Sequence, residues 1–113
     1  MIVVVRPIQR RLLPHSVGYR EYIMQGKHGE EWKDNIPITR VRVEPTNEVV
    51  TSSEGDEIQS NTRIFIDRVN SNPAFELAEK SKIIFDNKEY VVASVATLYA
   101  SSTQVHHWEV YCN

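Results

Sequence analysis

The sequence predicts an all-β fold, a small β-barrel of about six antiparallel strands with a long acidic loop and at most one short helix. β-Branched and aromatic residues recur with a period of two in several short segments, which is typical of half-buried strands. Turn-forming residues separate these segments, and the signals that mark helix ends are scarce. A barrel is expected because closing the sheet removes exposed strand edges.

Six segments show the strand pattern: residues 16–23, 36–43, 63–69, 82–85, 89–95 and 105–112. The fourth and fifth segments flank Asp86-Asn87-Lys88, whose residue types favour a tight turn, so the two segments are predicted to form a β-hairpin. The side chains expected in the core are Val41, Val43, Ile64 or Phe65, Ile84, Val91 and Trp108.

Two connecting segments are less regular. Residues 72–80 fit a short helix, because Asn72 is a good capping residue and Pro73 suits the first helical position, and they equally fit an irregular crossover. Residues 25–36 are polar and contain glycine, which predicts a loop whose Trp32 packs back against the barrel.

Length and composition bound the class of protein. A chain of 113 residues fits one domain, residues 1–113. The apolar start at residues 1–5 is too short for a membrane span or a signal-peptide core, so we expect a soluble protein made in the cytoplasm, with no membrane partner. The single cysteine, Cys112, cannot form a disulfide within the chain and is expected to be a buried or half-buried thiol.

Charge is distributed unevenly along the chain. Residues 44–62 contain five Asp and Glu and no Lys or Arg, whereas residues 1–43 contain eight Lys and Arg against four acids. The net charge of −2 argues against a dedicated nucleic-acid binder, which normally has a basic surplus. Loops longer than about 12–15 residues are usually functional or disordered, so residues 44–62 are the first candidate for function.

Residues 1–15 are predicted to form an extended basic arm. Its protein-docking residues are Arg10 and Arg11, which are charged, and Leu12 and Leu13, which are apolar anchors. Flanking prolines disfavour a regular helix here. Such an arm suits docking onto an acidic surface of another protein, and it equally suits a tail whose apolar residues cover the end of the chain's own barrel.

The sequence offers little for catalysis or metal binding. His106 and His107 are adjacent on an expected strand, so their side chains should point to opposite faces and not share a metal ion. Cys112 is nearly terminal, and no nucleophile-elbow or phosphate-binding motif occurs. The acids near residue 55 lie in a polar segment with little apolar surrounding. We therefore expect no enzyme activity, no cofactor and no metal.

Five segments in a fixed order resemble a known family: Arg11-Leu12-Leu13-Pro14-His15-Ser16-Val17, Val41-Arg42-Val43-Glu44-Pro45, Asp56-Glu57-Ile58-Gln59-Ser60-Asn61, Ile83-Ile84-Phe85-Asp86-Asn87-Lys88-Glu89-Tyr90 and His106-His107-Trp108-Glu109-Val110. Their order and spacing resemble the minor capsid protein family of tailed bacteriophages that infect Gram-positive bacteria. Within it, the chain is similar to the head-completion, or stopper, proteins of the head–tail connector.

This resemblance implies a structural virion protein at the head–tail interface, made in the cytoplasm of the bacterial host. It implies a homo-oligomeric ring, dodecameric in the virion, that lies below the adaptor protein on the portal and provides the surface for the tail completion protein. The ring closes the portal channel and retains double-stranded DNA, which passes through it without specific binding. By position, the channel-gating loop is residues 46–62.

The residues assigned to channel gating are Glu48, Val49, Val50, Thr51, Glu54, Asp56 and Glu57. In a ring, the four acids would form an anionic collar that repels DNA. The three residues at 49–51 are expected to pair between protomers as strands and close the channel. In the free protomer, we expect residues 44–62 to be disordered or mobile.

Two other functions fit a small barrel. The first is a single-stranded nucleic-acid-binding module, in which Tyr19, Tyr22, Tyr90 or Trp108 would stack on bases. The second is an interaction protein unrelated to phage, in which the acidic segment is only a disordered insertion. The acidic segment and the lack of a basic surplus weigh against the first of these.

Overall fold

The structure is a computed structural model that describes residues 5–26 and 29–113. Its elements, in chain order, are η1 (Arg10–Leu12), β1 (His15–Arg20), β2 (Tyr22–Gly26), β3 (Gly29–Trp32), β4 (Ile36–Thr51), β5 (Glu57–Asp67), β6 (Lys82–Phe85), β7 (Lys88–Leu98) and β8 (His107–Cys112). The only helical element in the described residues is the single 3-10 turn η1. Residues 72–80 form no helix and are an irregular crossover.

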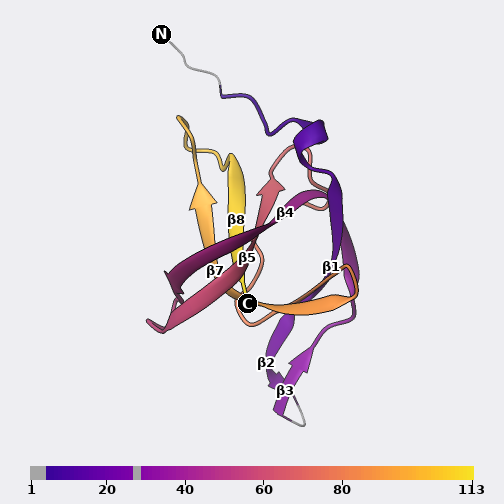
Figure 1. The fold of residues 1–113 in the computed structure, drawn as a ribbon, viewed down its shortest axis with the longest axis vertical. Coiled ribbons are helices and arrows are strands. Elements are labelled where there is room, and N and C mark those ends of the chain that lie inside the picture. Colours follow the sequence, from indigo (N-terminus) through magenta and orange to yellow (C-terminus); the bar gives the residue numbers. More distant parts are fainter. Residues whose placement is uncertain (1–4, 27–28) are drawn as a thin grey trace.

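Six of the strands close into a barrel in the order β1-β4-β5-β8-β7-β6, and β6 pairs with β1 to complete the ring. Every neighbouring pair is antiparallel. The all-β prediction is therefore confirmed. The remaining strands, β2 and β3, form a separate two-stranded hairpin at the end of the molecule opposite η1 (Figure 1).

The β2–β3 hairpin corrects two boundaries predicted from sequence. The expected strand at 16–23 breaks between β1 and β2, and part of the expected loop at 25–36 forms β3. The prediction that Trp32 packs back on the body is confirmed. Its indole Nε1 donates to the Lys80 carbonyl oxygen at 2.9 Å, and the Lys82 ammonium lies 3.9 Å from the centroid of its ring.

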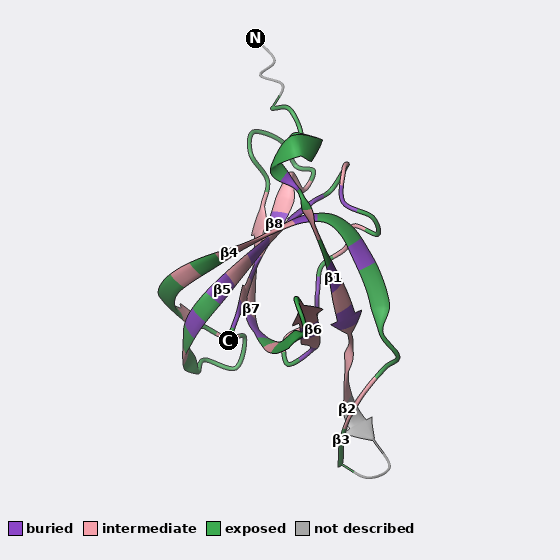
Figure 2. Ribbon diagram, turned by 45° about the vertical axis from the view of Figure 1, so that its right-hand side comes forward, coloured by how far each residue is buried: buried purple, intermediate pink, exposed green. Residues whose placement is uncertain are grey.

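The core fills the interior of the barrel, and along β1, β5 and β8 buried positions alternate with half-buried or exposed ones (Figure 2). Tyr19 is almost fully buried, and its hydroxyl lies 3.2 Å from the Ser81 hydroxyl and accepts the Ala78 N–H at 3.0 Å. These bonds attach the crossover to the barrel wall. Cys112 is also fully buried, and burial raises the pKa of its thiol to about 12, which makes the thiolate, its reactive form, scarce at neutral pH.

The predicted hairpin around Asp86 and Asn87 is present, with β6 and β7 on either side. Both turn residues have positive φ, 51° and 62°, as a two-residue turn of type I′ requires. The core residues of this hairpin differ from the expected ones by one position. Ile83 and Val92 are buried, whereas Ile84 is half-buried and Val91 is exposed. Because each strand has two adjacent apolar residues, alternation alone did not distinguish its faces.

The acidic segment 44–62 is not a loop. Its residues continue β4 and β5, which pair from Val41 opposite Ile66 as far as Thr51 opposite Glu57, so that only residues 52–56 form a turn. The expectation of a disordered or mobile loop is therefore wrong. Strand pairing was missed because both faces of this hairpin are largely polar, which leaves little apolar alternation to detect.

The reversed positions in β6 give a direct test of the observed register. We expect Ile83→Ala to lower the free energy of unfolding by about 2–5 kcal/mol, because it leaves a cavity in the core. We expect the matched variant Ile84→Ala to lower the free energy of unfolding by less than about half of that amount, because the Ile84 side chain is already partly exposed to water. Urea unfolding of both variants measures the difference, and a larger loss for Ile84→Ala would contradict the register.

Candidate functional site

The most prominent feature outside the barrel is the far part of the β4–β5 hairpin. β1 pairs with β4 only as far as Val41, and β8 pairs with β5 only as far as Thr62. Residues 46–51, the turn 52–56 and residues 57–61 therefore project beyond the sheet, and we call them the β4–β5 ribbon. Figure 1 shows the two paired strands leaving the barrel on one side.

A β-bulge marks the root of the ribbon. Pro45 pairs with Thr62 and Glu48 pairs with Ser60, so two residues of β4 lie opposite one residue of β5. Bulges of this kind bend a strand and increase its twist. The buried Ser60 hydroxyl lies 3.1 Å from the Thr62 carbonyl oxygen and 2.9 Å from the Cys112 carbonyl oxygen. Its hydrogen bond to Cys112 attaches the root of the ribbon to the end of β8.

The tip of the ribbon contacts the crossover through exposed polar groups. Ser53 donates to the Glu79 carboxylate from its hydroxyl at 2.8 Å and from its backbone N–H at 3.0 Å. The Lys80 ammonium lies 3.3 Å from a Glu54 oxygen. Solvent-exposed contacts of this kind contribute about 0–1 kcal/mol each, so the tip is held weakly in comparison with the root.

All seven residues assigned to channel gating lie on this ribbon. Val49 is 63% exposed, a large value for an apolar side chain, and Val50 on the other face is half-buried. The ribbon's acids are exposed, and in the described structure Asp56 and Glu57 form no ion pair. The ribbon therefore presents one exposed valine among negatively charged carboxylates, with no lysine or arginine beside them.

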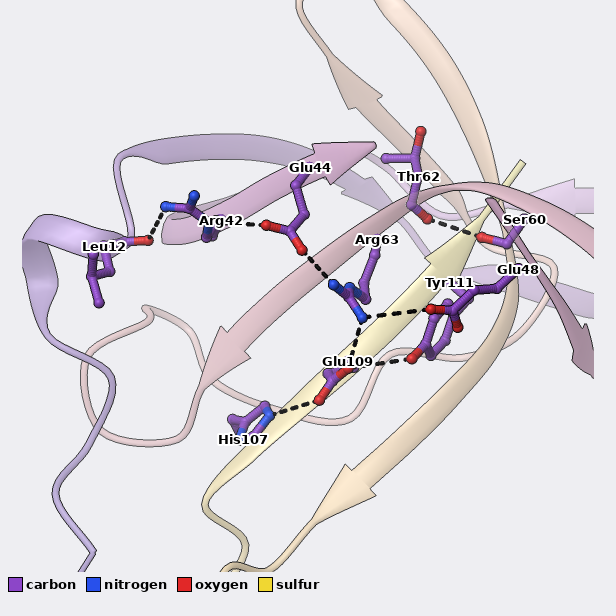
Figure 3. Close-up of polar contacts among 10 residues, drawn as sticks. All are labelled: Leu12, Arg42, Glu44, Glu48, Ser60, Thr62, Arg63, His107, Glu109 and Tyr111. Atoms are coloured by element: carbon purple, nitrogen blue, oxygen red, sulfur yellow. Dashed lines mark hydrogen bonds and ion pairs between the residues drawn. The ribbon is translucent and has the colours of Figure 1, made fainter. Parts of the chain in front are cut away.

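Arg63 connects the ribbon root to the outer face of the barrel (Figure 3). Its guanidinium lies 2.5 Å from a Glu44 oxygen, 3.6 Å from Glu109 and 3.8 Å from Glu48, and it covers the Phe65 ring at 4.8 Å from the centroid. Strands β4, β5 and β8 each contribute to this group, which we call the Arg63 cluster. The cluster fixes the point at which the ribbon leaves the sheet.

The electrostatics of the Arg63 cluster follow from these contacts. The hydrogen bond from Arg63, with a second from Arg42, holds the pKa of the Glu44 carboxyl below its usual value. Burial raises the pKa of the Tyr111 hydroxyl, which donates to Glu109 at 3.2 Å. Each carboxylate is engaged by a donor, so the arrangement is that of a structural ion-pair network and not of an acid and base poised for catalysis.

Sequence reasoning missed the Arg63 cluster. Its charged residues come from three strands, and only the register places Glu44 opposite Arg63 and Arg63 opposite Tyr111. The alternation of Arg63 with the buried Ile64 was visible in the sequence. The partner across the sheet was not, because strand pairing cannot be read from one strand.

The N-terminal arm lies across one end of the barrel. The Ile8 N–H donates to the buried Asp67 carboxylate at 2.9 Å, and Asn70 donates back to the Ile8 carbonyl oxygen at 2.7 Å. The His106 Nε2 lies 2.7 Å from the Arg6 carbonyl oxygen, and Arg42 donates to the Leu12 carbonyl oxygen at 3.4 Å. Backbone groups along the arm are therefore bound to the loops and strands beneath it.

The four predicted docking residues divide into two groups. Leu13 is fully buried and covers the end of its own barrel, so it is not an anchor for a partner. Arg10, Arg11 and the 43%-exposed Leu12 form the turn η1 at the surface, which corrects the expectation of an extended path at that point. The first four residues of the arm lie outside the described residues.

Two of the four aromatic residues proposed to stack on bases of single-stranded nucleic acid are buried. Tyr19 and Trp108 are buried, at 2% and 8% exposure, and Tyr22 packs edge-on against Trp32 with the ring centroids 5.7 Å apart. The structure therefore offers no row of exposed rings on the described barrel surface on which successive bases would stack.

The two adjacent histidines contact each other, contrary to the expectation that they point apart. Their Nδ1 atoms are 2.8 Å apart, because His106 precedes β8 and is not held to strand geometry. His107 Nε2 lies 3.0 Å from Glu109. No group of three His, Cys, Asp or Glu in the described part of the chain is placed to hold a metal ion. Among the same residues, no helix is long and apolar enough to cross a membrane.

Comparison with known proteins gives one result. The model of a family described as minor capsid protein matches residues 9–112 of this chain. Searches of curated proteins and of solved structures find no match. The matched range contains all eight strands of the structure.

The lowered pKa of Glu44 predicts a pH-dependent contribution to stability. That contribution is present above the usual carboxyl pKa and is lost as the pH falls through the lowered pKa of the folded state. We therefore expect Glu44→Gln to reduce the free energy of unfolding at neutral pH by about 1 kcal/mol and to have no effect in strong acid.

Urea unfolding at several pH values measures this difference. The matched control is Glu89→Gln, which removes a carboxylate that is 54% exposed and 3.6 Å from Lys82. Little pH dependence is expected for the control, because exposed pairs contribute little. A Glu44→Gln effect that stays constant from neutral to strongly acidic pH would contradict the role assigned to the Arg63 cluster.

Proposed function

The chain belongs to the minor capsid protein family, a family of structural virion proteins, and we propose that it is a head-completion, or stopper, protein of the head–tail connector. In this proposal the barrel forms a homo-oligomeric ring below the adaptor protein of the portal. The ring closes the channel so that packaged DNA is retained, and it provides the surface that the tail completion protein binds. The protein is made in the host cytoplasm and acts without catalysis.

The observation that carries this proposal is the β4–β5 ribbon. Its strands continue for six residues (46–51) and five residues (57–61) beyond the barrel. Six residues span roughly 20 Å at the rise of an antiparallel strand. The protomer measures 29 × 27 Å across its two shorter axes. In a ring of such protomers, each ribbon is long enough to reach from its own barrel into a central channel.

The charge of the ribbon suits a channel through which DNA passes. Cyclic symmetry repeats each acid around the axis, so Glu48, Glu54, Asp56 and Glu57 of all protomers form an anionic collar. DNA phosphates are repelled by such a collar. Lysine or arginine at these positions would bind phosphates with release of counterions and so impede the movement of DNA.

The backbone of the ribbon suits closure. Within the described residues, the outer edges of 46–51 and 57–61 pair with no third strand, and unpaired strand edges readily add another strand. In the proposed ring, Val49, Val50 and Thr51 pair between protomers to close the channel. The acids beside them oppose the same pairing between free monomers.

In this proposal the channel is opened and closed by a paired two-stranded ribbon and not by a disordered loop. A hydrogen-bonded ribbon moves as a unit, and the bulge at Thr46 and Asn47 is the point at which it bends. The exposed contacts with Glu79 and Lys80 at its tip are weak enough to be exchanged on assembly. The Arg63 cluster holds the root in place during this movement.

Shortening the ribbon tests the gating role. Replacing residues 49–59 with Asn-Gly joins Glu48 and Ser60, which already pair, through a two-residue turn. We expect heads that contain this variant to leak packaged DNA, because the segment that closes the channel is missing. The barrel should keep its thermal transition nearly intact, since the removed residues project beyond it. Nuclease sensitivity of the DNA in purified heads measures the leak.

The control deletes residues 101–103 from the exposed loop between β7 and β8, which this proposal assigns no part in gating. Immunoblots of the purified heads establish that both variants are incorporated. The proposal is wrong if heads with the shortened ribbon contain the protein and retain their DNA as well as the control does.

A further inference from the structure

A groove lies between the N-terminal arm and the outer face of the barrel. Ile8 and Leu12 line it on the arm side, Phe65 lines it on the barrel side, and Arg42 and Glu44 stand at its edge. Its volume is about 360 Å³. The lining is mainly apolar, and Leu12 is 43% exposed, so the groove has room for an apolar side chain from outside the protomer.

The arm and the segments that it contacts carry unpaired positive charge, and Arg10 and Arg11 adjoin Leu12 in η1. Five arginines lie on the arm and on the segments beneath it, and none of them forms an ion pair within the described residues: Arg6, Arg10, Arg11, Arg40 and Arg68. All five are exposed. Their charge favours a partner that brings carboxylates together with an apolar group.

The β4–β5 ribbon has this chemistry. On its exposed face, Val49 lies opposite Gln59, and two residues further along β4, Thr51 lies opposite Glu57. Val49 is 63% exposed, and Glu57 has no ion-pair partner in the described residues. The ribbon thus offers a single apolar side chain beside a free carboxylate, which matches an apolar groove beside free arginines.

We propose that the groove binds the β4–β5 ribbon of a second copy of this chain. This contact belongs to the open ring: Val49 of one protomer enters the groove between Leu12 and Phe65 of the next, and Glu57 and Asp56 contact Arg10 and Arg11. When the channel closes, the ribbon leaves the groove and points toward the axis. The two surfaces are different parts of the molecule, so the contact is head-to-tail. A head-to-tail contact repeats around an axis and forms a ring when its rotation closes.

This inference rests on the proposed function and names the contact that the ribbon makes while the ring is open. The strands of the ribbon, at roughly 20 Å, are longer than half of the 29 × 27 Å cross-section of the protomer, so the ribbon is long enough to reach a neighbour in contact. In the free protomer, Lys80 holds Glu54 at 3.3 Å. On assembly, that exposed ion pair gives way to contacts with the arginines of the neighbour.

Charge reversal on each surface tests the contact. The first variant is Arg10→Glu with Arg11→Glu, and the second is Asp56→Lys with Glu57→Lys. Neither change breaks an ion pair of the described protomer. We expect each variant alone to self-associate at least about tenfold more weakly than the natural chain, because like charges then face each other. Sedimentation equilibrium of the purified full chain measures the association.

Complementation separates a direct contact from loss of folding. A 1:1 mixture of the two variants, and the chain with all four substitutions, should both recover association, because opposite charges again face each other. The control is Arg20→Glu with Lys88→Glu. It changes the net charge by the same amount as the Arg10 and Arg11 variant, but at residues that do not line the groove, and it should associate like the natural chain. The inference is overturned if the mixture stays monomeric or if the natural chain does not associate.

The same variants separate this inference from the proposed function. If the Arg10 and Arg11 variant fails to enter connectors but self-associates normally, the arm binds another protein, and the ribbon contact is overturned while the stopper role stands. If association follows the charge pattern but heads with a shortened ribbon retain DNA, the ribbon contact stands and the gating role is wrong.

Discussion

The difference in length between neighbouring strands determines the shape of this protein. β4 pairs with β1 only as far as Val41 but continues beside β5 to Thr51. A barrel wall needs a neighbour on both sides of each strand, so the excess of β4 and β5 cannot be part of it. The excess leaves as a two-stranded ribbon with two unpaired edges. Both outer edges of the ribbon are unpaired in the described structure, which makes them a place where another chain can add.

Two kinds of contact divide the ribbon into a fixed root and a releasable tip. At the root, Arg63 engages carboxylates from two other strands, and the buried Ser60 hydroxyl contacts the backbone of β8. At the tip, Ser53 and Glu54 make exposed bonds to the crossover. Buried polar contacts are costly to break, whereas exposed ones are nearly neutral. The proposed gating requires this division, because the tip then exchanges its contacts while the root stays attached to the barrel.

The sequence predicted those elements whose cause is local. Asp86 and Asn87 form the turn that their residue types favour, and the barrel strands follow from alternation. It failed where the cause lies across the sheet. The ribbon is polar on both faces and was read as a loop, Ile83 and Ile84 are equally apolar and needed the register to be told apart, and Leu13 is buried by tertiary contact alone. All gating residues predicted from sequence lie on the ribbon, but their order as paired strands required the structure.

The central claim is that the ribbons of assembled protomers point into the channel. An electron cryomicroscopy reconstruction of the connector from mature heads, with this protein in place, tests it most directly. The account predicts density for residues 46–61 inside the ring, with Val49 to Thr51 nearest the axis. Ribbons found on the outer surface of the ring, away from the channel, would contradict it.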